Sequence, residues 1–279
     1  MSVVLWLLVV VDNVSKFLMK PTMLHVIKPG EAVTGIAQLG TELFLCSSDR
    51  VTVYDLNTYS PTRHVTVPGM KQPVGLAACK QNNCLYISDY GSNCIQRVNL
   101  SNSSCSKWSL NAAPRGVSLT RAFNLLVTLS QSIEEYTTSG NLIRSIELDV
   151  SIDNARHAIE LSSGQFVVCH QGSAHHQRVC VVDTAGRIVH SYGGPPGSSA
   201  GQLNGPRRLV VDTHGYVLVA DCFNHRVQVL SPTLTRLGDV TTPGHQLNAP
   251  YALHLDELNG RLYVGYNPSN VLVLSALSV

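Results

Sequence analysis

A repeat of about forty residues runs through most of this 279-residue chain and constrains its fold more than any other feature. The repeats begin near residues 32, 72, 113, 154, 205 and 249. Their equivalent positions are separated by 40, 41, 41, 51 and 44 residues, and they are Val33, Pro73, Pro114, Ala155, Pro206 and Pro250. The one long step contains GGPPGSSAGQLNG, residues 193–205, whose Gly, Pro and Ser content predicts an extended loop.

Each repeat has the same internal order of short apolar segments and polar turns. In the copy that begins near residue 205, RRLVVD (207–212) is followed by the turn THG, then by YVLVAD (216–221) and HRVQVLS (225–231). A weaker fourth segment closes most copies, such as IRSIEL at residues 143–148. No window shows a sustained helical period. Four short strands that recur every forty or so residues predict an all-β fold, a six-bladed β-propeller of four-stranded blades.

The two ends of the repeat array complement each other. The sixth copy ends at VLVLSALSV, residues 271–279, and lacks a fourth strand, whereas the strand-like TMLHVIK at residues 22–28 has no first strand before it. We expect residues 22–28 to supply the outer strand of the last blade, which removes an open seam. The expected organisation is therefore a single propeller domain over residues 19–279.

Residues 1–18 have no assigned place in this scheme. Their apolar run, Val3 to Val11, is too short to span a bilayer. It also lacks the basic start and the small-residue cleavage site of a signal peptide. We interpret it as a buried strand or as the remnant of a longer parent chain.

One copy resembles the NHL repeat closely. Residues 203–230 read LNGPRRLVVDTHGYVLVADCFNHRVQVL, and YISDYGSNCIQRV at residues 86–98 preserves part of the same pattern. The resemblance extends over roughly residues 30–275, where the other copies agree by period and position. NHL propellers often form the C-terminal part of tripartite-motif (TRIM-NHL) proteins, whose RING, B-box and coiled coil supply ubiquitin-ligase activity and oligomerisation. This sequence has no RING or B-box pattern and no heptads, so any ligase activity would belong to parts absent from this chain.

The resemblance implies that ligands bind to the face made by the loops that enter the first strands and the loops between second and third strands. We call it the loop face. Three successive copies place an arginine at the same position on it, and a local basic patch is therefore expected on a chain of net charge +2. The candidate ligand-binding residues are Lys71, Arg115, Arg156, Arg207, Arg208, Arg226 and Tyr251.

The chemistry of these residues fits a protein or RNA partner, because arginine forms bidentate contacts with carboxylates and phosphates. The alternative is an ordinary solvated rim, balanced by nearby acids such as Glu31, Asp49 and Asp153. Stacking of RNA bases would need exposed aromatic side chains. The chain is only 6% aromatic, and it offers Tyr90, Phe223, Tyr251 and Tyr266.

Three further loop residues are expected to be structural. Asp89 and Asp221 end the second strands of their copies, where an aspartate accepts hydrogen bonds from backbone N–H groups. Asn224 is of a type that tolerates a positive φ. We therefore expect these residues to shape the turns.

Four histidines crowd one copy and are candidate metal ligands, namely His157, His170, His175 and His176. They share a single blade and a loop rich in Gly and Ser, so we expect no specific metal site and no cofactor. The positions expected nearest the channel mouth are Gly35, Gly75, Gly116, His157, Arg208 and Ala252. They include no carboxylate, although calcium prefers oxygen ligands. Neither a G-x-S-x-G elbow nor a P-loop occurs.

These observations predict a propeller that is not an enzyme. We expect it to act as a protein- or RNA-recognition platform. It could be the substrate-recognition part of a TRIM-NHL-type ubiquitin ligase or regulator. The alternative is a secreted six-bladed propeller hydrolase or lyase with a metal in the central channel. It draws on the eight cysteines, on the apolar N-terminus and on three glycosylation sequons at Asn13, Asn99 and Asn102.

The cysteines leave the compartment open. No CxxC pair occurs, and Cys79 and Cys84 flank the turn KQNN, where either a local disulfide or two free thiols would fit. Half-buried free thiols are the interpretation we favour. We accordingly expect a cytoplasmic location, a monomeric propeller and no membrane span, with secretion as the alternative.

Overall fold

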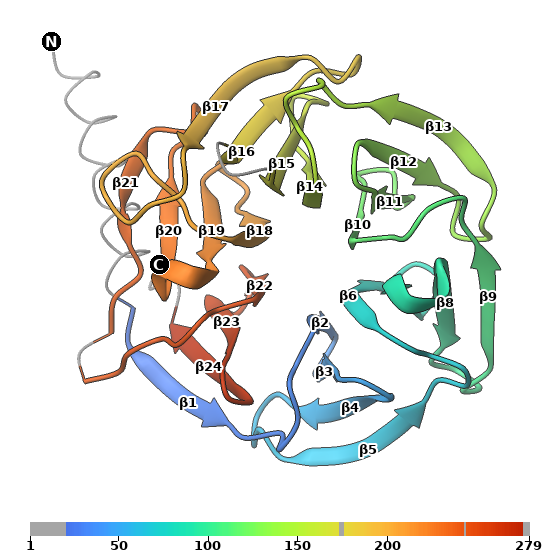
Figure 1. The fold of residues 1–279 in the computed structure, drawn as a ribbon. Coiled ribbons are helices and arrows are strands. Elements are labelled where there is room, and N and C mark those ends of the chain that lie inside the picture. Colours follow the sequence, from blue (N-terminus) through green and yellow to red (C-terminus); the bar gives the residue numbers. More distant parts are fainter. Residues whose placement is uncertain (1–20, 173–175, 243, 276–279) are drawn as a thin grey trace, which may run out of the picture.

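The computed structural model describes residues 21–172, 176–242 and 244–275, and residues 1–18 lie outside this part of the chain. Six four-stranded antiparallel sheets stand around a central axis like the blades of a propeller (Figure 1). The predicted all-β fold with six blades is confirmed. No helix in the described ranges is long and apolar enough to cross a membrane.

Each blade runs from an inner strand beside the axis to an outer strand at the rim. Blades 1 to 3 consist of β2 (Gly35–Leu39), β3 (Glu42–Cys46), β4 (Arg50–Asp55), β5 (Pro61–Thr66); β6 (Pro73–Cys79), β7 (Cys84–Asp89), β8 (Cys94–Asn99), β9 (Cys105–Ser109); and β10 (Gly116–Leu119), β11 (Leu125–Thr128), β12 (Ser132–Tyr136), β13 (Leu142–Glu147). Blades 4 and 5 consist of β14 (Ala155–Glu160), β15 (Phe166–Gln171), β16 (Gln177–Val182), β17 (Ile188–Gly194); and β18 (Pro206–Val211), β19 (Val217–Asp221), β20 (Arg226–Leu230), β21 (Arg236–Asp239).

The sixth blade closes the ring with strands from both ends of the chain. It is ordered β22 (Ala252–Asp256), β23 (Arg261–Tyr266), β24 (Asn270–Ser275) and β1 (Met23–Ile27). β1 pairs antiparallel with β24, so that Ile27 lies opposite Val271. The expected closure by an N-terminal strand is confirmed. Beside β1, the backbone N–H of Ser275 donates to the carbonyl oxygen of Thr22 at 2.9 Å.

The hydrophobic core is divided among the six interfaces between neighbouring blades. Strand side chains alternate between two faces, and each middle strand therefore serves two interfaces. On β19, Leu218 packs against blade 6, while Val217 and Val219 pack against blade 4. This arrangement explains why the second strand of every blade is almost wholly buried. It makes each blade depend on both neighbours.

Closure of the ring can be tested through Ile27, which is buried in the interface of blades 6 and 1. We expect Ile27→Ala to lower the free energy of unfolding by about 2–3 kcal/mol, because the truncation leaves a cavity in a packed core. Leu24→Ala, on the same strand but 48% exposed, is the control and should change it little. Urea unfolding followed by circular dichroism measures both. Equal small effects would mean that β1 adds little to the ring.

All eight cysteines are free thiols, and all except Cys105 are buried. Cys79 and Cys84 are register partners on β6 and β7 but are not bonded to each other, in agreement with the favoured interpretation. Burial raises the pKa of the Cys46, Cys169 and Cys180 thiols to about 12. These three thiols are therefore neutral and poor nucleophiles at physiological pH.

Candidate functional site at the channel mouth

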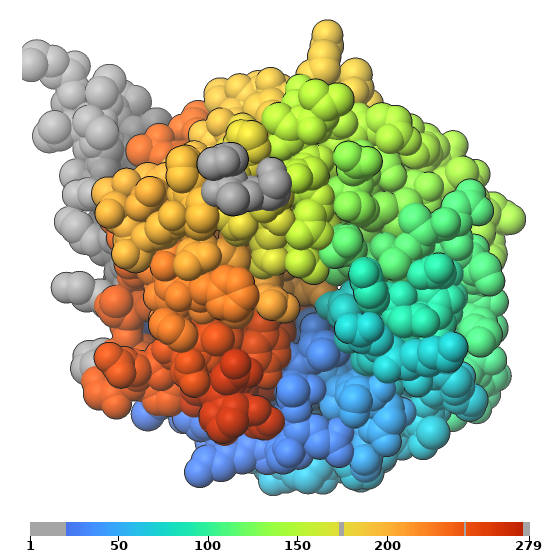
Figure 2. Space-filling model, viewed as in Figure 1, coloured from blue at the N-terminus to red at the C-terminus, as the bar shows by residue number. Residues whose placement is uncertain are grey.

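Three arginines stand side by side where the channel opens on the loop face. Arg115 directly precedes β10, while Arg156 and Arg207 are the second residues of β14 and β18. The repeat thus delivers the same residue type to the same place on three successive blades. A space-filling view along the ring axis shows the blades meeting around a narrow central hollow (Figure 2). The mouth is a cavity of about 120 Å³, lined by Thr34, Val74, Tyr90, Arg115, Arg156, Arg207, Arg208 and Tyr251.

Aromatic rings hold two of these guanidinium groups in place. The Cζ atom of Arg115 lies 5.4 Å from the ring centroid of Tyr90, and that of Arg207 lies 5.7 Å from the ring centroid of Phe223. Arginine stacks on aromatic faces, and the contact limits the freedom of a long side chain. The guanidinium groups are therefore partly preorganised for a ligand.

No acidic side chain neutralises the mouth within the described part of the chain. None of its lining residues is Asp or Glu. The Nε atoms of Arg115 and Arg156 are buried and have no hydrogen-bond partner among the described residues. Burial lowers the pKa of Arg156, and the positive charges of Arg115 and Arg207 lower it further. Such an arrangement favours binding of an anion.

Arg208 lies deeper than its neighbour because successive strand residues point to opposite sides. Its side chain crosses the channel from β18, and Nη1 donates long hydrogen bonds to the carbonyl oxygens of Arg115 at 3.4 Å and Arg156 at 3.5 Å. A Cβ atom on Gly75 or Gly116 would lie 2.9 or 3.0 Å from its guanidinium nitrogens. The absence of a side chain at these two glycines therefore leaves room for the guanidinium group of Arg208.

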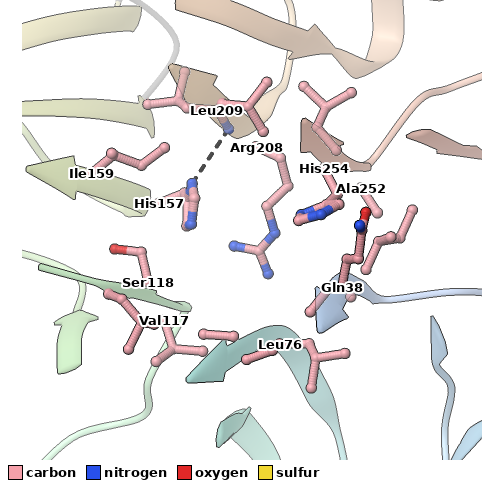
Figure 3. A pocket seen from close by; sticks show the side chains of 18 residues that line it. Gln38, Leu76, Val117, Ser118, His157, Ile159, Arg208, Leu209, Ala252 and His254 are labelled. Carbon is pink, nitrogen blue, oxygen red and sulfur yellow. Dashed lines mark hydrogen bonds between the residues drawn. The ribbon is translucent and has the colours of Figure 1, made fainter. Parts of the chain in front are cut away.

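Below the mouth, the channel widens into a cavity of about 210 Å³. The Arg208 side chain extends into it between the rings of His157 and His254 (Figure 3). The Nδ1 atom of His157 accepts a hydrogen bond from the backbone N–H of Leu209 at 3.3 Å. Burial lowers the pKa of His157 to about 3 and that of His254 to about 4. Both imidazoles are neutral at physiological pH.

The predicted turn aspartates support the loop face from beneath. Asp221 is fully buried and accepts hydrogen bonds from the backbone N–H of Asn204 at 2.6 Å and from the side chains of Asn224, Arg226 and Gln228. In blade 2, the Asp89 carboxylate accepts from the backbone N–H groups of residues 71 and 72. Each aspartate therefore ties the end of a second strand to the loop that enters the first strand.

Two candidate residues at the turn from β19 to β20 have roles other than those expected. The Nε atom of Arg226 donates to Asp221 at 2.8 Å, and Nη2 donates to the carbonyl oxygen of Gln202 at 3.0 Å. Its guanidinium thus binds the insertion loop and is not part of the mouth. Asn224 does not adopt a positive φ, because it lies in the 3₁₀ turn η2 (Cys222–Asn224). The positive φ falls instead on the next residue, His225, whose φ is 55°. Asn93 at the equivalent place in blade 2 also has a positive φ, of 48°.

The remaining candidate binding residues divide between the mouth and its surroundings. Tyr251 lines the mouth, and its hydroxyl accepts a hydrogen bond from the backbone N–H of Val33 at 3.3 Å. Lys71 is exposed and does not line the mouth. Tyr266 is buried in the interface of blades 5 and 6, so it is not available for stacking.

The three described histidines of blade 4 do not form a metal site. His157 lies in the channel, whereas His170 is buried on β15, where its Nε2 accepts a hydrogen bond from Nε of Arg178 at 3.3 Å. His175 lies outside the described residues, and His176 directly precedes β16. Across the described ranges, no group of three or more His, Cys, Asp or Glu side chains could hold a metal ion.

His254 was not among the residues selected from the sequence. The expected channel positions Gly35, His157, Arg208 and Ala252 do line the cavity. A second layer of lining residues follows two positions later on each inner strand, namely Ala37, Ala77, Ser118, Ile159, Val210 and His254. Counting two residues along each strand would have found this layer, since side chains at i and i+2 share a face.

Comparisons with known proteins fit this architecture. Residues 203–230 match the family described as NHL repeat. The matched segment contains the first three strands of blade 5. A comparison with curated proteins finds no match. Similar solved structures include a streptogramin B lyase, at 11% identity over 91% of this chain and 96% of that chain, with a TM-score of 0.64.

Two further solved structures share the fold. One is virginiamycin B lyase from Staphylococcus aureus, at 11% identity over 92% of this chain and 99% of that chain, with a TM-score of 0.64. The other is a protein of unknown function from Bacteroides caccae, at 17% identity over 80% of this chain and 81% of that chain, with a TM-score of 0.65. At these identities, the likeness establishes the shared fold alone.

The prediction that the chain is not an enzyme is contradicted by these structures, because two of the similar propellers are lyases and the shared fold therefore does not exclude catalysis. That prediction relied on missing carboxylates near the channel mouth and on missing catalytic motifs. A fold can host several chemistries, and function depends on its individual sites. The absence of two familiar patterns therefore does not separate a binding propeller from a catalytic one.

Proposed function

We propose that the chain is a ligand-binding propeller whose loop face recognises an anionic group at the arginine-lined mouth. One observation carries the proposal: four guanidinium groups surround a single small cavity whose lining residues include no carboxylate. Guanidinium groups bind carboxylates and phosphates through paired, charge-assisted hydrogen bonds. An anion in the mouth would also relieve the mutual repulsion that contributes to the lowered pKa of Arg156.

The dimensions of the mouth favour an acidic segment of a partner protein over RNA. A cavity of about 120 Å³ admits one or two carboxylate groups rather than a nucleotide. A guanidinium group covers one face of each of the Tyr90 and Phe223 rings, which leaves less aromatic surface on which bases could stack. The net charge of +2 provides no broad field for a polyanion. In a protein of the TRIM-NHL type, such a face would supply partner recognition.

The triple variant Arg115→Ala/Arg156→Ala/Arg207→Ala tests the proposal. The probe is a fluorescein-labelled deca-glutamate peptide, titrated in 50 and 200 mM salt. We expect binding that weakens with salt, because the contacts are ionic. The triple variant should bind at least about 30-fold more weakly, because each lost charge-assisted hydrogen bond is worth about 1.5–3 kcal/mol.

A charge-matched control separates the mouth from net charge. Arg63→Ala/Arg121→Ala/Arg187→Ala removes three arginines that lie away from the mouth and should leave peptide binding within about threefold. Equal losses in both triple variants, or no binding at 50 mM salt, would refute an anion site at the mouth. A random single-stranded RNA 20-mer, measured in parallel, decides the ligand class: binding of RNA without binding of the peptide would replace the acidic partner with nucleic acid.

A further inference from the structure

Arg208 is a buried cation without a counter-charge. Its relative exposure is 8%, and the charged neighbours that act on it among the described residues include no Asp or Glu. Only Nη1 has hydrogen-bond acceptors in the described structure, which are the two carbonyl oxygens at 3.4 and 3.5 Å. Burial lowers the pKa of Arg208 to about 10, so the guanidinium is still charged at physiological pH. A charge in this state is costly unless an anion joins it.

The cavity around this guanidinium is otherwise apolar or neutral. Its walls include Leu76, Val117, Ile159, Leu209 and Leu253, and its lining residues include no Asp or Glu. The imidazoles of His157 and His254 carry no charge at physiological pH, as their lowered pKa values require. A ligand in this cavity would therefore meet one positive charge at one end and hydrocarbon around the rest of its surface.

The size of the cavity sets the size of the ligand. Its volume is about 210 Å³. An apolar protein cavity of about 150 Å³ accepts benzene. The channel cavity therefore accommodates a ring of six atoms together with a carboxylate group.

The cavity and the mouth are separate compartments that share Arg208. The guanidinium lies across the channel between them, in contact with blades 3 and 4 through its hydrogen bonds. The inner strands begin at the loop face, so residues later in each strand, such as Gln38 and His254, lie toward the opposite face. A ligand that reaches the cavity from the opposite face would meet the guanidinium without passing through the mouth.

The geometry points to a second binding site, in which the channel cavity holds a small aromatic or short-chain carboxylic acid whose carboxylate pairs with the Arg208 guanidinium. A carboxylate is planar and matches two parallel N–H donors of a guanidinium. One guanidinium balances one negative charge, which favours a carboxylate over a doubly charged phosphate. This site shares Arg208 with the mouth, but it does not need the other three arginines of the mouth.

Calorimetric titration of the purified chain with benzoate tests the site, and benzamide serves as the neutral probe of matching shape. We expect benzoate to bind with a dissociation constant below about 1 mM, and benzamide at least about tenfold more weakly, since it cannot form the charged pair. Arg208→Met should weaken benzoate binding at least about 20-fold. Arg208→Lys keeps the charge without the planar donor pair and should weaken it about fivefold or more.

Thermal unfolding shows whether the variants are folded. Arg208→Met removes a buried unpaired charge and should melt at or above the wild-type temperature. Saturating benzoate should raise the melting temperature of the wild type but not that of Arg208→Met. Two results would overturn the proposal. One is that Arg208→Met binds benzoate as tightly as the wild type does. The other is that the wild type does not bind benzoate at 5 mM, which is about five times the largest dissociation constant expected.

The triple variant of the mouth distinguishes the two sites. Arg115→Ala/Arg156→Ala/Arg207→Ala should bind benzoate within about threefold of the wild type, because these side chains do not line the channel cavity. Loss of benzoate binding in this variant, with binding retained in Arg208→Met, would assign the probe to the mouth and refute the channel site. Failure of the deca-glutamate peptide to bind, with benzoate bound normally, would refute only the function proposed for the mouth.

Discussion

Replacing Asp221 with alanine should lower the free energy of unfolding by about 3–5 kcal/mol, because it removes one partner of a buried ion pair. The Asp221 carboxylate is fully buried, and its Oδ2 accepts from Nε of Arg226 at 2.8 Å. It also satisfies the backbone N–H of Asn204 and the side-chain amides of Asn224 and Gln228. Alanine would remove this acceptor from all four donors, of which the Gln228 amide is fully buried.

Urea unfolding of Asp221→Ala, followed by circular dichroism, measures this loss. Asp183→Ala is the matched control, because Asp183 also accepts hydrogen bonds from backbone N–H groups and pairs with an arginine, but in an exposed turn. We expect the control to lose about 1 kcal/mol or less, as exposed pairs do. Similar losses in both variants would show that the loop network beneath the mouth is not a main source of stability.

Acidification from pH 7 to pH 5 should remove stability through His157, His170 and His254, whose pKa values are lowered, and the two least exposed of them, His157 and His170, should together contribute about 4 kcal/mol. Burial lowers the pKa of His157 to about 3 and that of His170 to about 4, from an ordinary value of 6.5. The unfolded chain takes up protons below pH 6.5, while the folded chain keeps both rings neutral until the pH approaches 4. This stability is therefore complete above pH 6.5 and is lost as the pH falls, by about 2 kcal/mol per histidine at pH 5.

Urea unfolding at pH 7, 6 and 5 tests this dependence. His157→Gln and His170→Gln should each reduce the difference in stability between pH 7 and pH 5 by about 2 kcal/mol. The exposed His190→Gln is the control and should leave that difference unchanged. Burial raises the pKa of Asp212 and Asp221, which acts in the opposite sense, so the comparison between variants decides the result. A pH dependence that neither buried variant reduces would contradict the prediction.

The repeat made the fold predictable because each blade obeys local rules. A prediction of the ring required only the forty-residue period, the two-residue alternation and the complementary ends of the array. Asp89 and Asp221 were also predictable as turn residues, since an aspartate that ends a strand accepts bonds from nearby backbone N–H groups. These inferences depend only on residues that are close together in the sequence.

The position and the hydrogen-bond partners of each arginine side chain depend on contacts with residues that are distant in sequence. Arg207 and Arg208 are adjacent, yet the first lies at the channel mouth and the second reaches across the channel to the carbonyl oxygen of Arg115, 93 residues away. Arg226 was expected on the ligand face, but Asp221 and the insertion loop bind its guanidinium. Sequence position identifies the blade and the loop of an arginine, whereas its partners are determined by the closed ring.

The pairing of β1 with β24 has a mechanical consequence. Thr22 and Ser275 are hydrogen-bonded neighbours at the same end of an antiparallel strand pair. Tension applied between these two residues would load the rungs of the ladder one after another, in the manner of a zipper, instead of loading them all together in shear. We therefore expect the seam that closes the ring to open at a lower pulling force than a strand pair loaded in shear.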